Sequence, residues 1–151
     1  MTVKGPFWRR SPLRGDRRGM AAVEFALVSL VMMMWIFGIM EVARAFWTYQ
    51  IIQEVAIQGA RCMGIKSSSC APGGSYSAAA AQSYMVAVAS NLGLTLPAGD
   101  INPTRPANCA TIPNFSSVTI SYTFNTNMPA LIPALSSVVL TASSCAYDTQ
   151  S

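Results

Sequence analysis

The sequence predicts an α+β protein: a long N-terminal helix with a membrane-spanning part, then a small domain with a second helix and a short antiparallel β-sheet. Three observations lead to this fold class. An apolar run of about 20 residues follows a basic leader. Apolar side chains then continue at helical spacing to Met63. Near the C-terminus, a segment alternates with the period of a half-buried strand.

The first element joins the basic leader to the apolar run. Residues 1–19 hold six basic residues against one acid, a net charge of +5, whereas the rest of the chain holds four bases and five acids. No charge lies between Phe25 and Met40, and Glu24 alone interrupts the run that begins at Met20. About 20 helical residues cross a hydrocarbon core of roughly 30 Å. The bases before Met20 predict a cytoplasmic N-terminus and an extracytoplasmic remainder.

Beyond the apolar run, the helical rhythm predicts one continuous helix to about residue 65. A helix from Met20 to Met63 would be about 65 Å long, so half of it is expected outside the membrane. Its apolar stripe is expected to pack either on the chain's own domain or on another subunit. The stripe consists of Val42, Ala45, Phe46, Tyr49, Ile52, Ala56, Ala60 and Met63.

The chain is therefore expected to have three parts. Residues 1–19 form a basic cytoplasmic leader, and residues 20–65 form the long helix, with its transmembrane part at about 20–40. Residues 66–151 form the extracytoplasmic α+β domain.

Within that domain, a breaker-rich loop ends at Ser75, the expected N-cap of a second helix over Tyr76–Leu92, and Gly93 is its expected C-cap. Four prolines predict an irregular connection over residues 93–114.

Two strands complete the predicted domain. Residues 117–124 alternate, with Val118, Ile120, Tyr122 and Phe124 on one face and serine or threonine on the other. Residues 137–144 are expected to pair with them across a loop at 125–136, and the hydroxyl face is expected to be solvated.

All four cysteines follow the apolar run, where an oxidising compartment permits disulfides. Four cysteines allow three pairings. We favour Cys62 with Cys70, which closes a short loop, and Cys109 with Cys145, which ties the chain end to its middle. A zinc site is the rival explanation, but the chain has no histidine and no C-x-x-C pair, so no metal and no cofactor are expected.

Composition argues against an enzyme and against a nucleic-acid-binding protein. Without histidine, the commonest general base and all Ser-His-Asp arrangements are missing. An enzyme would have to use Asp100, Asp148, Arg105 and hydroxyl groups of the outer domain for catalysis, and no sequence motif supports such a site. Beyond the leader only four bases remain, too few to follow a phosphate backbone.

Glu24 is unexpected in this run, because placing an ionised carboxylate in a membrane span costs free energy, on the order of 2–3 kcal/mol at the centre and less near the interface. It could extend to the headgroups beside the leader's arginines. The string from Arg17 to Phe25 also resembles the type IV prepilin signature. That resemblance implies cleavage by a prepilin peptidase between Gly19 and Met20, and pairing of Glu24 with the new N-terminus of a neighbouring subunit.

The resemblance continues along the helix. The segments FGIMEVAR (37–44), YQ (49–50) and GAR (59–61) are similar to the TadE family of pseudopilins in the tight-adherence (Tad, or Flp) pilus apparatus. The similarity extends over about residues 17–145 and is specific in the N-terminal third. Phe25 stands where the major pilins of this system usually carry tyrosine, so the aromatic ring is retained.

The resemblance implies a minor pilin or pseudopilin that takes part in assembly or initiation of a pilus used in adherence. Its partners would be a prepilin peptidase, other pilins, the inner-membrane assembly platform and the membrane itself. Two alternatives stay open. One is an uncleaved single-pass envelope protein whose outer domain binds a ligand or surface. The other is a secreted product cut after Ala45, at the A-x-A sequence that begins at Ala43.

Overall fold

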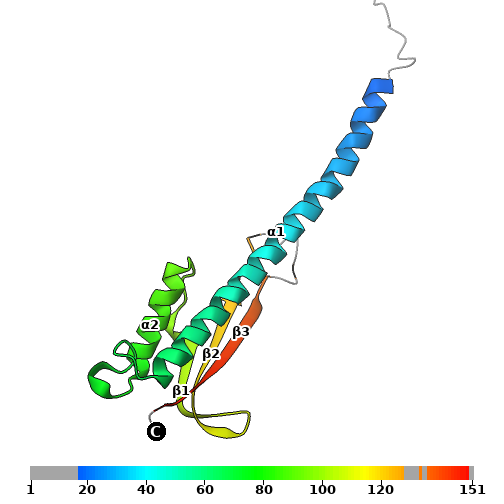
Figure 1. Ribbon diagram of the computed structural model, residues 1–151. Helices are drawn as coiled ribbons and strands as arrows, with labels where there is room; N and C mark the ends of the chain where they lie inside the picture. The colour runs from blue at the N-terminus through cyan, green and yellow to red at the C-terminus, as the bar shows by residue number, and fades with distance from the viewer. Residues whose placement is uncertain (1–16, 128–132, 134–135, 150–151) are drawn as a thin grey trace, which may run out of the picture. The chain divides into compact units, whose positions relative to one another are not determined.

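The computed structural model describes residues 17–127, 133 and 136–149 (Figure 1). They belong to two compact units, the first ending at Phe37 and the second beginning at Gly38. The predicted leader up to residue 16 and part of the predicted loop at 125–136 lie outside the described residues. The predicted α+β fold class is confirmed, with two α-helices and one three-stranded antiparallel sheet in the described residues.

Helix α1 (Arg17–Gly64) contains 48 residues and runs through both units. No proline interrupts this stretch of sequence, and most of its residues favour helix. The helix ends where Lys66 adopts a left-handed backbone conformation with φ of 48°. Among the described residues, α1 alone is long and apolar enough to span a membrane, with a mean hydropathy of 2.1 over its most apolar window.

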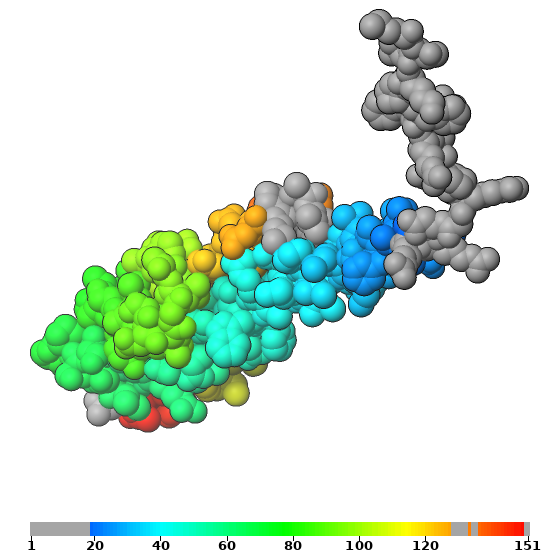
Figure 2. Space-filling view, turned by 90° about the horizontal axis from the view of Figure 1, so that it is seen from above, coloured from blue at the N-terminus to red at the C-terminus, as the bar shows by residue number. Residues whose placement is uncertain are grey.

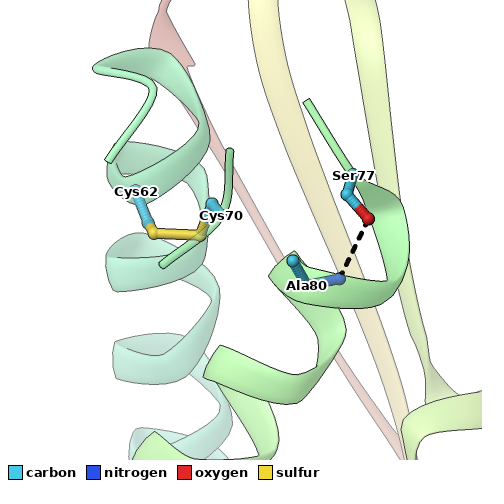
Figure 3. Close-up of a disulfide and its surroundings, with 4 residues drawn as sticks. All are labelled: Cys62, Cys70, Ser77 and Ala80. Atoms are coloured by element: carbon cyan, nitrogen blue, oxygen red, sulfur yellow. Dashed lines mark hydrogen bonds between the residues drawn. A yellow bond between two sulfur atoms is a disulfide. The ribbon is translucent and has the colours of Figure 1, made fainter. Parts of the chain in front are cut away.

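Helix α2 (Ala78–Asn91) follows a loop that contains one short 3₁₀ turn, η1 (Pro72–Gly74). The expected N-cap at Ser75 is wrong, because Ser77 holds that position and accepts a hydrogen bond from the Ala80 backbone N–H at 3.4 Å (Figure 3). At the other end, Gly93 has φ of 82° and stops the helix as predicted.

The sheet has the strand order β1-β2-β3, from β1 (Ile101–Cys109), β2 (Ile112–Phe124) and β3 (Val138–Tyr147). A second 3₁₀ turn, η2 (Ala98–Asp100), leads into β1. All neighbours are antiparallel, and Ile120 lies between Ile101 and Ala142.

The irregular connection expected over residues 93–114 is wrong for most of its length, because β1 occupies Ile101–Cys109 and β2 begins at Ile112. Two of the prolines that argued against a strand, Pro103 and Pro106, lie within β1. β1 is an edge strand, where a missing N–H donor is tolerated, and its register shifts between Thr104 and Ala107.

The core of the second unit lies between the helices and one face of the sheet. From above, the surfaces of α2 and the later part of α1 lie against one another (Figure 2). The predicted alternation of β2 is confirmed, since Val118, Ile120 and Phe124 are buried. The largest fully buried apolar side chains come from every layer: Ile52, Val55, Met63, Met85, Ile101, Val118 and Ile120.

The apolar stripe predicted along α1 divides in two. Its later members are buried in this core: Ile52, Ala56, Ala60 and Met63. Its earlier members Val42, Phe46 and Tyr49 are exposed. The chain's own domain therefore covers only the later part of the stripe.

Candidate functional site

The segment predicted to be cleaved lies in the first turn of α1. Gly19 is the third residue of the helix, and Met20 is exposed. The first four N–H groups of a helix have no partner within it, so few backbone hydrogen bonds hold this turn. The Gly19–Met20 bond is thus at a place where the helix can unwind at low cost.

Glu24 and Phe25 are also exposed on α1. Glu24 lies four residues after Met20, which places the two on the same helix face one turn apart. No hydrogen bond or ion pair joins Glu24 to the side chains that the structure describes. Its carboxylate is therefore available to a positive group from outside the described part of the chain.

The rest of the first unit presents apolar side chains in all directions. A shallow recess between neighbouring helical turns is lined only by Phe25, Val28, Ser29, Met32, Met33 and Ile36. An apolar surface that surrounds a helix on all sides is typical of a membrane span or of a helix covered by other chains.

A second acid on α1 has the opposite environment. Glu41 is only 5% exposed, and both its carboxylate oxygens accept hydrogen bonds from Arg44 Nη1, at 2.8 and 3.0 Å. The Arg44 guanidinium also lies over the ring of Phe124, 5.6 Å from its centroid. The i,i+3 spacing on a helix is a sequence signal for such a pair, whereas the contact with the sheet has none.

Two of the three charged residues considered for an enzyme pair with each other. Arg105 donates from Nε to Asp148 Oδ2 at 2.5 Å, and its Nη2 contacts the same oxygen. Asp148 is buried and the Arg105 side chain is 10% exposed, while Asp100 lies in η2. This pair joins edge strand β1 to the segment that follows β3, a structural role that the sequence did not predict.

Tyr76 completes this cluster, with the Arg105 guanidinium 5.8 Å from the centre of its ring. Its hydroxyl oxygen is buried and has no hydrogen-bond partner among the described residues. Burial raises the pKa of Tyr76, and the positive charge of Arg105 partly opposes that rise.

Two disulfides close the second unit in the pairing that the sequence analysis favours. Cys62 at the end of α1 is bonded to Cys70 in the following loop, with their Cα atoms 6.0 Å apart (Figure 3). Cys109 at the end of β1 is bonded to Cys145 in β3, 36 residues later. Across the described ranges, no three histidine, cysteine, aspartate or glutamate side chains gather as a metal site would require.

Comparison with known proteins gives one match. Residues 19–61 match the family model described as TadE-like protein, and the match begins at the residue before the predicted cut. No curated protein and no solved structure matches the chain. The match extends over 43 of the 151 residues, so it shows a likeness of this segment of α1 to TadE-like proteins.

Proposed function

We propose that this chain is a minor pilin or pseudopilin of a Tad/Flp-type pilus. In this proposal a prepilin peptidase cuts between Gly19 and Met20, and the mature protein takes part in assembly or initiation of a pilus used in adherence. The observation that carries the proposal is the TadE-like match, which suggests involvement in a Tad pilus system. The other partners would be the inner-membrane platform and further pilins.

The geometry of the helix start supports the cleavage step. A peptidase needs an extended backbone at the bond that it cuts, and the first helical turn supplies the least hydrogen-bonded part of α1. Gly19 removes any side chain from the residue on the N-terminal side of that bond, and a Cβ placed there would have nothing within 4 Å.

The exposure of Glu24 supports the assembly step. After cleavage the new amine at Met20 carries a positive charge, and Glu24 is an exposed acid without a partner among the described side chains. In an apolar environment each charge is costly alone, and pairing offsets much of that cost. Pairing between subunits would set the axial position of one helix against the next, as the family resemblance implies.

For orientation, we propose a single pass through the inner membrane, with the N-terminus in the cytoplasm and the second unit on the periplasmic side. The excess of basic residues in 1–19 supports this direction. The two disulfides of the second unit also suit an oxidising compartment.

The structure also bears on a secretory cut after Ala45. Such a cut would fall inside α1 and would remove Glu41 together with its partner Arg44, whose guanidinium lies over the ring of Phe124. A product that begins at Phe46 would therefore lose an ion pair and a cation–π contact of the second unit.

Mass spectrometry of membrane-extracted, non-reduced protein tests the proposed cleavage. Native material should begin at Met20 and carry two disulfides. Material that begins at Met1 would support the uncleaved envelope anchor instead, and material that begins at Phe46 would support a secreted product. Gly19→Leu should leave the leader attached, and a normal mature mass in that variant would overturn the cleavage site.

Pilus counts by electron microscopy test the role of Glu24. Glu24→Gln should be cleaved normally but should lower the number of pili by tenfold or more, on the order of the effect of losing one desolvated charge pair. Glu54→Gln is the matched control, because Glu54 is an exposed acid on the same helix that only accepts a hydrogen bond from Gln58. Normal piliation of the Glu24 variant would contradict the assembly role.

A further inference from the structure

The first turns of α1 in the second unit have a reversed amphipathic pattern. Glu41 is buried, and Thr48 on the same side is half-buried. On the opposite side, Phe46 is 63% exposed and Trp47 is 71% exposed. A helix that faces water normally places its charged residues outward and its aromatic residues inward.

The polar side chains of Glu41 and Thr48 make hydrogen bonds within the chain. Glu41 is held by Arg44, and the Thr48 hydroxyl donates to the Arg44 carbonyl oxygen at 2.9 Å. The outward surface left over is apolar, and it continues the apolar surface of the preceding turns through Ile39, Met40 and Val42. A surface of this composition matches lipid rather than water.

The positions of charged residues along the helix indicate how deep this surface lies in the membrane. From Phe25 to Arg44 there are 20 residues, about 30 Å of helix, which equals the thickness of the hydrocarbon core. The charged residues in that stretch are Glu41 and Arg44, and the two neutralise each other as an ion pair. With these limits Glu24 lies at the cytoplasmic interface, and the span is shifted by about four residues from the expected 20–40.

Trp47 follows Arg44 by three residues, about 5 Å along the helix, and Tyr49 by five residues, about 8 Å. The headgroup layer on each side of a bilayer is about 5–8 Å thick. Tryptophan and tyrosine are enriched in that layer, because their rings combine an apolar body with one polar group. Trp47 and Tyr49 therefore lie at the depth where such residues are found.

We propose that the outward face of α1 formed by Phe46 and Trp47 is seated in the non-cytoplasmic headgroup layer of the membrane that α1 spans. This inference depends on the membrane span and not on leader cleavage or pilus assembly.

Fluorescence quenching in vesicles tests this depth. The full chain contains three tryptophans, Trp8, Trp35 and Trp47. One variant, Trp8→Phe/Trp35→Phe, retains only Trp47, and Trp8→Phe/Trp47→Phe retains only Trp35. A third variant, Trp8→Phe/Trp35→Phe/Trp47→Phe/Ile65→Trp, retains only the new tryptophan and provides the water-facing control. Ile65 is exposed and directly follows the end of α1 in the same unit.

Each protein is reconstituted in vesicles of phosphatidylcholine and phosphatidylglycerol. Mass spectrometry of the non-reduced protein confirms that its disulfides are intact. The quenchers are lipids labelled at the headgroup or deep in the acyl chain, and iodide on both sides of the membrane. Trp47 should be quenched at least about twofold more by the headgroup label than by the deep label, and Trp35 the reverse. Iodide should quench Trp47 at least about threefold less than the Ile65→Trp control.

Two results would overturn the proposal. Iodide quenching of Trp47 equal to that of the Ile65→Trp control, with no effect of labelled lipid, would show that this face is in water. Protection of Trp47 from both iodide and labelled lipid would show that another protein surface, such as a second copy of the chain, covers it.

Discussion

Helix α1 contains two acids that flank the same apolar run, and the two differ in exposure and in pairing. Glu24, in the first unit, is exposed and has no partner among the described side chains. Glu41, in the second unit, is buried and paired with Arg44. The difference is that Glu41 is neutralised within its own unit, whereas Glu24 has no such partner among the described side chains.

The apolar residues of α1 show the same contrast. Ile36 in the first unit is 48% exposed, while Ile52 in the second is 0% exposed and contacts the core. Burial of one such side chain contributes about 1.5–3 kcal/mol to stability. The free energy of unfolding of the second unit should therefore come from its own core, and lipid or other subunits should stabilise the first. Four predictions test this contrast.

The largest effect is expected from breaking the buried ion pair of the second unit. Arg105→Ala removes the guanidinium from the buried Asp148 carboxylate, and loss of one partner of a buried ion pair costs about 3–5 kcal/mol. Urea unfolding of the detergent-solubilised full chain, followed by near-ultraviolet circular dichroism, measures this loss. Arg105→Met/Asp148→Leu is the control, because replacing both charges should restore most of the stability. A cost below about 1 kcal/mol for the single variant would show that the pair is effectively solvated.

The second prediction compares two isoleucines on one helix. Ile52→Ala removes a fully buried side chain and should lower the free energy of unfolding by about 2–5 kcal/mol. Ile36→Ala makes the same chemical change in the first unit and should alter the unfolding of the second unit by less than about 0.5 kcal/mol. Equal losses in the two variants would remove the contrast between the units.

Much of this fold follows from local sequence patterns. The helical rhythm and the lack of proline predict α1, and the alternation of Val118 and Ile120 predicts β2. Strand β1 was not predicted, because prolines such as Pro103 and Pro106 usually indicate a loop when only the local sequence is considered. Its edge position, which makes these prolines acceptable, depends on the assembled sheet.

The candidate site divides in the same way. Gly19, Glu24 and Phe25 could be proposed from the sequence because the prepilin signature that they resemble is a short local string. The Arg105–Asp148 pair joins residues 43 positions apart, so no local sequence pattern predicts it. The N-cap illustrates a smaller limit, since Ser75 and Ser77 are chemically equal and only the fold of the loop selects Ser77.

The third prediction concerns two glycines of α1. A Cβ on Gly64 would lie 2.7 Å from the Tyr147 carbonyl oxygen, so Gly64→Ala must push the end of β3 away from the helix. Overpacking of this kind costs about 1–3 kcal/mol. A Cβ on Gly38 would meet nothing within 4 Å, so Gly38→Ala should leave stability equal or raise it by about 0.5–1 kcal/mol through helix propensity. The same urea experiment measures both, and a Gly64 variant as stable as the parent would contradict the close approach.

The smallest effect is expected at Tyr76, and it depends on pH. Its hydroxyl is buried without a hydrogen-bond partner among the described residues, so Tyr76→Phe should change the free energy of unfolding at pH 7 by less than about 1 kcal/mol. The folded protein raises the pKa of Tyr76 above its unfolded value, so its contribution is fully present below about pH 10. That contribution is lost as the pH rises through the folded pKa, because the unfolded chain ionises first.

Above about pH 10, therefore, the parent should lose more stability with each step in pH than Tyr76→Phe does. Tyr147→Phe is the control, since Tyr147 is exposed on β3 and its removal reports the general effect of losing one tyrosine. Parallel alkaline profiles for the parent and the Tyr76 variant would show that the phenol is solvated in the folded protein. A loss above about 2 kcal/mol at pH 7 would show instead that its hydroxyl makes a hydrogen bond. The first result would contradict the burial of the Tyr76 phenol beside Arg105, and the second would contradict its lack of a hydrogen-bond partner among the described residues.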